Sequence, residues 1–306
     1  MQLAREQWTQ RAAEGTLTPS LVRAVKSDGY AILESVFPEE KLATWRDTFG
    51  ELLEAKLAED DNSRGNNRVN VKVPIAGPFN DPELLHNDLV MPVVYELFGP
   101  DPICSWYTAD TPLPGAEYQP AHKDDRGLFP SADVALPIYA LVINVPLVDC
   151  REDNGPMEWW PGGTHMLTGV SPIEGSADRK PMRGIMPKGS VFIRDTRMWH
   201  RGTPNNSGEI RPLMSLVMSR FWYMFGELIA DGPRLNIDAE TYDGFADELK
   251  SLFRYADVPG DRTMQVRIDA QKRTSPLREP TGAGGPIGVA SNRRLSGHSR
   301  NYMGVI

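Results

Sequence analysis

The sequence is organised around the stretch Gln119-Pro-Ala-His122-Lys-Asp124 and a second histidine, His200, far downstream. Side chains of an extended strand alternate between its two faces, so His122 and Asp124 of this His-x-Asp pair point to the same side. A third ligand from a distant strand completes two histidines and one carboxylate on one face of a metal ion. That set leaves the opposite face of the metal open, which is the arrangement of non-haem Fe(II) oxygenases.

The same stretch is also typical of a charged surface loop, because Lys123, Asp125 and Arg126 surround the pair. The length and composition of the chain limit the number of domains and the kinds of partner. A chain of 306 residues is long enough to bury a substantial core, as one large domain or two small ones. A net charge of −8 argues against nucleic acid or an anionic membrane as the main partner.

Nothing in the sequence predicts a membrane or secreted protein. No stretch approaches the roughly 18 apolar residues of a membrane span, and the first residues are not those of a signal peptide. The two cysteines, Cys104 and Cys150, lie in apolar segments and are expected to be buried thiols in a reducing cytosol. The sequence therefore predicts a soluble cytoplasmic protein with one catalytic or binding domain.

The amino-terminal part of the chain carries helical spacing interrupted by short strands. Apolar residues recur at three-to-four spacing over 21–25 and 42–57, and a further helix is predicted over 84–98. Residues 29–37 and 69–73 alternate and predict strands. In the second strand the valines share one face, and the other face carries Asn70 and Lys72.

From Ile103 onward the pattern becomes that of a β protein. Turn-forming clusters separate apolar runs at 103–109, 136–148, 156–160, 190–194 and 212–223. Such short strands predict a sandwich or barrel, with the earlier helices covering one side. Residues 238–255 return to helical spacing, and the rest is rich in Gly, Pro, Ser and Arg. We expect one domain over 1–258 and a disordered tail or an arm over 259–306.

The segment around His200 supplies a second cluster of polar residues. A strand over 190–194 leads through a turn to His200, a Pro-Asn-Asn-Ser-Gly loop, and a β run that opens with Arg211. A hairpin of this kind brings Arg211 back close to His200. A guanidinium beside a metal suits a dicarboxylate co-substrate, whose far carboxylate it can hold with two parallel hydrogen bonds. A surface arginine at the end of a strand is the alternative, and the residues alone leave both open.

Together these motifs resemble the phytanoyl-CoA dioxygenase (PhyH-like) family of Fe(II)/2-oxoglutarate oxygenases. The likeness rests on His122-x-Asp124, on His200, and on Arg211 eleven positions later. The stretch Asn154-Gly-Pro-Met-Glu-Trp-Trp-Pro-Gly-Gly-Thr-His165 is similar to the family's Asn-Gly-Pro…Pro-Gly-Ser-His signature. The amino-terminal patterns Asp28-Gly-Tyr-Ala-Ile-Leu and Asp81-Pro-Glu-Leu also match, so the likeness spans roughly residues 20–225.

The resemblance implies a mainly β fold with flanking helices, whose core is a double-stranded β-helix (a cupin-like jelly roll). It further implies O2 as co-substrate, 2-oxoglutarate held by Arg211, and Fe(II) held by His122, Asp124 and His200. Because position 124 is Asp rather than Gly or Ala, no metal position is freed for chloride, which disfavours a halogenase.

Other residues match the family more loosely. Gln119 corresponds to a glutamine that contacts the co-substrate in some members, and Lys72 or Asn70 is a candidate for a further polar contact. Trp106, Trp222 and Asn70 are candidate pocket residues, because such pockets are largely apolar with few polar groups. Packing in the core or between subunits is the alternative for the two tryptophans, and the aromatic run at 220–225 favours a homodimer.

The function expected from the resemblance is oxidation of a small molecule, with hydroxylation as the default outcome and specialised metabolism as the setting. Two other functions remain open. One is a metal hydrolase or isomerase on a jelly roll, in which the same triad holds zinc or manganese and Arg211 is not needed. The other is a non-catalytic jelly-roll binding module, which would not depend on His122 or Asp124.

Overall fold

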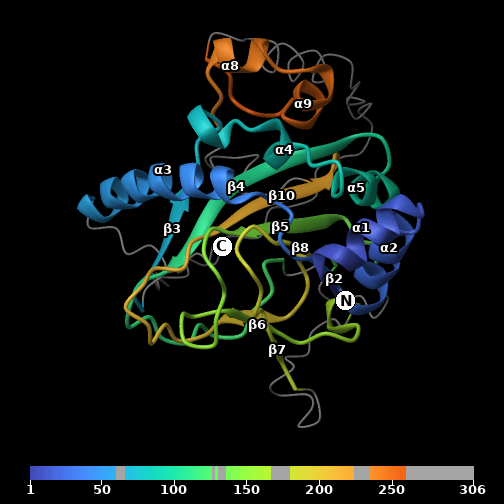
Figure 1. Cartoon of the computed structure of the whole chain (residues 1–306). Helices are drawn as coiled ribbons and strands as arrows, with labels where there is room; N and C mark the ends of the chain where they lie inside the picture. The colour runs from blue at the N-terminus through green and yellow to red at the C-terminus, as the bar shows by residue number, and fades with distance from the viewer. Residues whose placement is uncertain (60–65, 126–127, 130–135, 167–179, 224–234, 260–306) are drawn as a thin grey trace, which may run out of the picture. The chain divides into compact units, whose positions relative to one another are not determined.

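The computed structural model of the chain describes residues 1–59, 66–125, 128–129, 136–166, 180–223 and 235–259 (Figure 1). The chain divides into two units, Met1–Pro259 and Gly260–Ile306, and every described residue belongs to the first. The predicted tail therefore lies outside the described residues apart from Pro259, and the single-domain organisation stays a prediction. None of the helices in the described ranges has the length and apolar character needed to span a membrane.

Two β-sheets form the core of the first unit. The larger has seven strands in the order β1-β2-β8-β5-β10-β4-β3, and the smaller has three in the order β7-β6-β9. The large-sheet strands are β1 (Gln2–Leu3), β2 (Tyr30–Leu33), β3 (Arg68–Lys72), β4 (Pro102–Pro112), β5 (Ala140–Pro146), β8 (Val191–Asp195) and β10 (Leu213–Arg220). The small-sheet strands are β6 (Met157–Trp159), β7 (Met182–Arg183) and β9 (His200–Gly202).

The order in which the chain visits the two sheets defines the fold. After β5 it crosses to β6 and β7, returns to the large sheet at β8, crosses again to β9, and ends in β10. Apart from the parallel pair β1–β2, the pairs within both sheets are antiparallel. This alternation between two facing antiparallel sheets is the double-stranded β-helix, or jelly roll, and the predicted fold class is confirmed.

The two faces of the large sheet have different neighbours. Figure 1 shows the helices on one side of this sheet and β6 and β7 on the other. Because strand side chains alternate, Leu141, Ile143 and Val145 of β5 enter the main hydrophobic cluster on the helical side. Asn144 of the same strand is buried on the opposite face, which lines the space between the sheets. Polar residues of the large sheet are therefore placed inside the barrel.

Helices cover the outer face of the large sheet. They are α1 (Arg5–Ala13), α2 (Leu17–Asp28), α3 (Glu39–Ala58), α4 (Pro82–Leu85), α5 (Met91–Phe98), α8 (Ala239–Asp243) and α9 (Asp247–Leu252), with 3-10 turns at η1 (Gly77–Phe79) and η2 (Thr164–Met166). The predicted strands at 29–37 and 69–73 correspond to β2 and β3. Both cysteines are buried and free, as predicted.

The single helix predicted over 84–98 is wrong, because the chain breaks between α4 and α5. The carbonyl of Asn87 accepts from the amides of Val90 (3.0 Å) and Met91 (2.8 Å), which starts a new helix there. Pro92 then lies in the first turn of α5, where its missing N–H costs nothing. The helix predicted over 238–255 is likewise two short helices, α8 and α9.

Candidate active site

Three side chains from two neighbouring segments meet between the sheets. His122 and Asp124 lie on an extended segment that follows β4, and His200 begins β9. The two segments are joined because the amide of each histidine donates to the carbonyl of the other, both at 2.9 Å. One ligand atom from each of the three side chains lies within 4.8 Å of the others. The structure therefore brings the predicted triad together.

Backbone carbonyls fix the imidazoles in the form that binds a metal. Nδ1 of His122 lies 2.8 Å from the carbonyl oxygen of Pro120, and Nδ1 of His200 lies 2.9 Å from that of Met198. A carbonyl oxygen can only accept, so each Nδ1 carries the proton and donates it. Each Nε2 is then left with its lone pair, the tautomer that metal-binding histidines adopt.

Both lone pairs point toward one carboxylate oxygen. Nε2 of His122 lies 3.9 Å from Asp124 Oδ1, and Nε2 of His200 lies 3.4 Å from the same atom. Burial, followed by the nearby His200 charge, lowers the pKa of His122 to about 4. This imidazole is therefore neutral near pH 7, which metal binding requires.

The second oxygen of Asp124 is held by an arginine. Nη1 of Arg194 on β8 lies 2.6 Å from Asp124 Oδ2, in an ion pair that lacks the angle of a straight hydrogen bond. Burial alone would raise the pKa of Asp124, but Arg194 and then His200 hold it well below its usual value. Asp124 is therefore a carboxylate with Oδ1 turned to the histidines and Oδ2 turned to Arg194.

Arg194 is itself fixed by the neighbouring strands. Its Nε donates to Oδ1 of Asn144 at 3.1 Å, and Nδ2 of Asn144 donates to Oγ of Ser215 at 2.6 Å. This buried chain crosses β8, β5 and β10 on the face that looks toward the small sheet. Because groups behind a metal ligand fix its orientation, the chain determines where Asp124 Oδ1 points.

A second buried ion pair supports the turn that leads to His200. The amide and Nε of Arg197 donate to Oδ1 of Asp195 at 2.8 and 2.9 Å, and Nη2 donates to Oδ2 at 2.7 Å. The guanidinium also lies 4.9 Å from the centre of the Tyr139 ring. These contacts hold the residues between β8 and β9 in one conformation.

Two buried arginines lie near the end of β9. Arg211 donates through Nε (3.2 Å) and Nη2 (2.7 Å) to the carbonyl of Gly155. Arg68 of β3 donates through Nε (3.3 Å) and Nη2 (3.2 Å) to the carbonyl of Glu117, and through Nη2 to that of Thr203. Its guanidinium lies against Gly202, two residues after His200, where an added Cβ would overlap it.

Within the part of the chain that the structure describes, each of these arginines keeps one nitrogen without a hydrogen bond. Nη1 of Arg211 and Nη1 of Arg68 are both buried and unpartnered, although the latter lies 3.8 Å from Asp110 Oδ2. Burial lowers the pKa of Arg68 to about 10; Asp110 opposes this and the Arg211 charge adds to it. A buried cationic donor without a partner destabilises the protein. An anion bound here would accept from these donors and offset that cost.

The residues present thus fit the group that the resemblance implies. Two imidazole nitrogens and one carboxylate oxygen are the donor set for Fe(II). Two buried guanidiniums with one unpartnered nitrogen each are suited to the carboxylate of 2-oxoglutarate.

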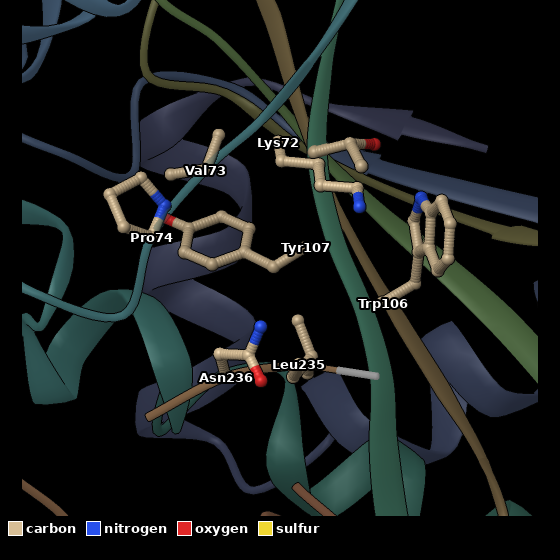
Figure 2. A pocket seen from close by; sticks show the side chains of 8 residues that line it. Lys72, Val73, Pro74, Trp106, Tyr107, Leu235 and Asn236 are labelled. Atoms are coloured by element: carbon tan, nitrogen blue, oxygen red, sulfur yellow. The ribbon is translucent and has the colours of Figure 1, made fainter. Parts of the chain in front are cut away.

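The remaining predicted residues lie apart from this group or have other partners. Gln119 pairs with Gly202, whose amide donates to the Gln119 side-chain oxygen at 2.9 Å. Lys72 is exposed at the end of β3, and it lines a cavity with the half-buried Trp106 (Figure 2). Asn70 shares the face of β3 that carries Lys72. Trp222 is 52% exposed and lies 6.2 Å from the Tyr139 ring.

Arg68 and Arg194 are missing from the sequence prediction. The sequence offers one signal for both: a cation in a short β run beside a valine or an isoleucine, with Val69 after Arg68 and Ile193 before Arg194. In a strand with one buried face such a residue is expected on the solvent side. In this fold the second face of the large sheet is covered by the small sheet, so the arginines on that face are buried.

The fold and the site together define a class of protein. A jelly roll that presents two histidines and one carboxylate between its sheets is the architecture of the non-haem iron oxygenases. The family model of the phytanoyl-CoA dioxygenases (PhyH) matches residues 25–213. The chain belongs to this family and is an Fe(II)/2-oxoglutarate-dependent dioxygenase, with Fe(II) as cofactor and 2-oxoglutarate and O2 as co-substrates.

Solved structures share the fold at low sequence identity. AviO1 from Streptomyces viridochromogenes Tue57 is 18% identical, with 68% of this chain and 97% of that chain covered and a TM-score of 0.53. EctD from S. alaskensis, solved with 2-oxoglutarate and 5-hydroxyectoine, is 20% identical, with coverage of 65% and 74% and a TM-score of 0.53. The epimerase SnoN from nogalamycin biosynthesis is 18% identical, with coverage of 67% and 84% and a TM-score of 0.52.

Proposed function

We propose that this dioxygenase hydroxylates a small molecule of specialised metabolism, with iron bound by His122, Asp124 and His200. The observation that carries the proposal is the convergence of two Nε2 lone pairs on Asp124 Oδ1, beside a second oxygen that Arg194 already holds. When bound together, Fe(II), 2-oxoglutarate and O2 supply an oxidant that converts a substrate C–H to C–OH, while the other oxygen atom enters succinate as CO2 leaves.

The protein's own residues bind and orient the reactants. His122 and His200 donate through Nε2, because their Nδ1 protons are given to backbone carbonyls. Arg211 holds the far carboxylate of 2-oxoglutarate through its unpartnered Nη1, and Arg68 adds a second cationic donor nearby. Gln119 acts mainly by accepting a hydrogen bond from the Gly202 amide. This bond keeps β9 in register with the segment that carries His122.

Two features support the finer parts of this proposal. Hydroxylation uses the same Fe(II), 2-oxoglutarate and O2 as the other oxidations of this chemistry, and it is the simplest outcome because the second oxygen atom of O2 is transferred directly to the substrate carbon. A natural-product substrate agrees with the fold shared with SnoN of nogalamycin biosynthesis. A cytoplasmic location and a homodimer stay predictions, the latter in line with the exposed Phe221 and Trp222.

The test is an anaerobic titration of the metal-free protein with Fe(II) and then with 2-oxoglutarate, followed in visible light. We expect a metal-to-ligand charge-transfer band that saturates with 2-oxoglutarate, and afterwards succinate release when candidate substrates are screened in air. Tight iron binding without the band would instead indicate a hydrolase or isomerase. A protein that binds no metal would be a binding module rather than an enzyme.

A further inference from the structure

A cavity of about 210 Å³ opens where β3 ends, beside the middle of β4. In Figure 2 the Lys72 side chain crosses β4 and Trp106 lies on one side of this strand, whereas Tyr107 lies on the other, as do Leu235 and Asn236 from the chain that leads to α8. At roughly 30 Å³ for each water molecule, the space equals about seven waters. It is smaller than the roughly 300–1,000 Å³ of a site that encloses a whole drug-sized ligand, so it suits one end of a larger molecule.

The cavity borders the face of the large sheet that also carries the candidate metal site. Trp106 pairs with Val217, Val217 pairs with Val142, and Val142 pairs with Arg194. Side chains at directly paired positions share one face of a sheet. Arg194 contacts Asp124, so Trp106 and the triad look into the same space. Three strand spacings of about 4.8 Å put Trp106 roughly 14 Å from Arg194 along the sheet.

Among the described residues that line the cavity, Lys72 is the charged one. Within the described residues, the Lys72 ammonium has no ion pair or hydrogen bond, and no carboxylate lines the cavity. Its polar neighbours are the Thr108 hydroxyl and the Asn236 amide, which donate readily to an anion. The remaining wall is apolar and includes the Trp106 indole, the Tyr107 ring and Leu235.

We propose that this cavity binds the acidic end of the substrate, and that the substrate is an organic acid with a flat or bulky apolar body. Lys72 attracts the carboxylate, and the body lies along Trp106 with its far end toward the triad. The inference rests on the proposed function, since it names the substrate class of the same site. It assigns Lys72 to the substrate, because 2-oxoglutarate already has Arg211 and Arg68 as anchors.

Exposure is the physical reason for this assignment. Arg211 and Arg68 are 1% and 0% exposed, so their contacts are desolvated and suited to tight, uniform binding of one co-substrate. Lys72 is exposed, and an ion pair in water is weak and reversible. A substrate that must enter, react and leave as product suits the weaker anchor.

The experiment compares two probes of the same shape, of which one carries a carboxylate and the other a neutral amide. Calorimetric titrations use 2-naphthoate and its neutral counterpart 2-naphthamide, with the full chain loaded with Fe(II) and 2-oxoglutarate without oxygen. We expect the wild-type protein to bind the acid about three- to fivefold more tightly than the amide, the effect of one exposed ion pair. Lys72→Met should remove this preference and leave the affinity for the amide unchanged.

Two further variants separate charge from packing. Trp106→Ala should weaken both probes by the same factor, roughly five- to tenfold, because it removes an aromatic wall and no charge. Lys26→Met is the matched control, since Lys26 is an exposed lysine on α2 that lies outside the cavity. It should bind both probes like the wild type.

Several results would overturn the inference. They are equal binding of acid and amide by the wild type, a preference that survives Lys72→Met, and no binding of either probe. A charge-transfer band that demands more 2-oxoglutarate in Lys72→Met would also overturn it, because Lys72 would then serve the co-substrate. Absence of the band in the wild type would refute the proposed function instead. The band is recorded in visible light before any probe is added, so this failure is distinguished from a failure of the charge preference.

Discussion

The candidate metal site and the cavity beside Lys72 differ in how their polar groups are held. At the metal site, each ligand has its other polar atom tied to the protein: His122 to Pro120, His200 to Met198, and Asp124 to Arg194. In the cavity the Lys72 ammonium has no partner among the described residues. The polar groups of the candidate metal site are preorganised by their surroundings, whereas the proposed substrate cavity leaves its cation for a ligand to pair.

The largest effect should come from removing a ligand of the preorganised site. His122→Ala deletes one of three donors that the backbone has already oriented. Changes behind a metal ligand alone reduce affinity about 10- to 100-fold, so we expect Fe(II) affinity to fall by more than about 100-fold. Anaerobic equilibrium dialysis with Fe(II) measures it. His86→Ala is the control, because this histidine contacts Tyr95 instead of the triad; equal iron affinity in both variants would contradict the site.

The next effect concerns the co-substrate anchor. Arg211→Met keeps most of the side-chain volume and removes the buried Nη1, which has no hydrogen-bond partner among the residues that the structure describes. A hydrogen bond between charged groups contributes about 1.5–3 kcal/mol, so the 2-oxoglutarate concentration that half-saturates the charge-transfer band should rise about 10- to 150-fold. Iron binding should be retained. If the band saturates as in the wild type, Arg211 does not hold 2-oxoglutarate.

The triad and Arg211 show what the sequence could predict. His122, Asp124, His200 and Arg211 were predicted from short motifs, because their spacing within one segment or hairpin limits where the side chains can lie. In the large sheet, β2 and β3 were predicted from alternation, and β4, β5, β8 and β10 from apolar runs between turn-forming clusters; neither pattern needs knowledge of the partner strand. The strands β1, β7 and β9 were missed, since each has two or three residues and only pairing defines it.

Arg68 and Arg194 were missed for a different reason. In β3 the valines alternate with Arg68, Asn70 and Lys72, a pattern that a one-sided sheet would place toward water. In a jelly roll the second face looks into the barrel, so the same alternation places Arg68 in the interior and Lys72 at its rim. Which of the two is buried depends on Gly202, Glu117 and Thr203, which are remote in sequence.

A smaller effect should follow from loosening the support behind Asp124. Arg194→Met removes the guanidinium from Asp124 Oδ2 and takes the Nε donor away from Asn144 Oδ1. Because the carboxylate can then rotate, we expect Fe(II) affinity to fall about tenfold, at the lower end of such outer contacts. Equilibrium dialysis is again the measurement, with thermal unfolding to confirm a folded protein. Arg183→Met, which removes a surface ion pair with Glu152, should bind iron like the wild type.

The smallest effect tests the role of Arg68 without substituting Arg68 itself. Gly202→Ala adds a Cβ that overlaps the Arg68 guanidinium, while the Gly202 backbone is in a conformation open to alanine. The guanidinium must shift, so we expect 2-oxoglutarate affinity to drop roughly three- to tenfold, as for one weakened charged hydrogen bond. Iron affinity should hold, because the triad is untouched. Gly208→Ala, where a Cβ meets nothing within 4 Å, is the matched control. A drop in iron affinity alone would show that Arg68 positions β9 and that Arg211 holds the co-substrate without it.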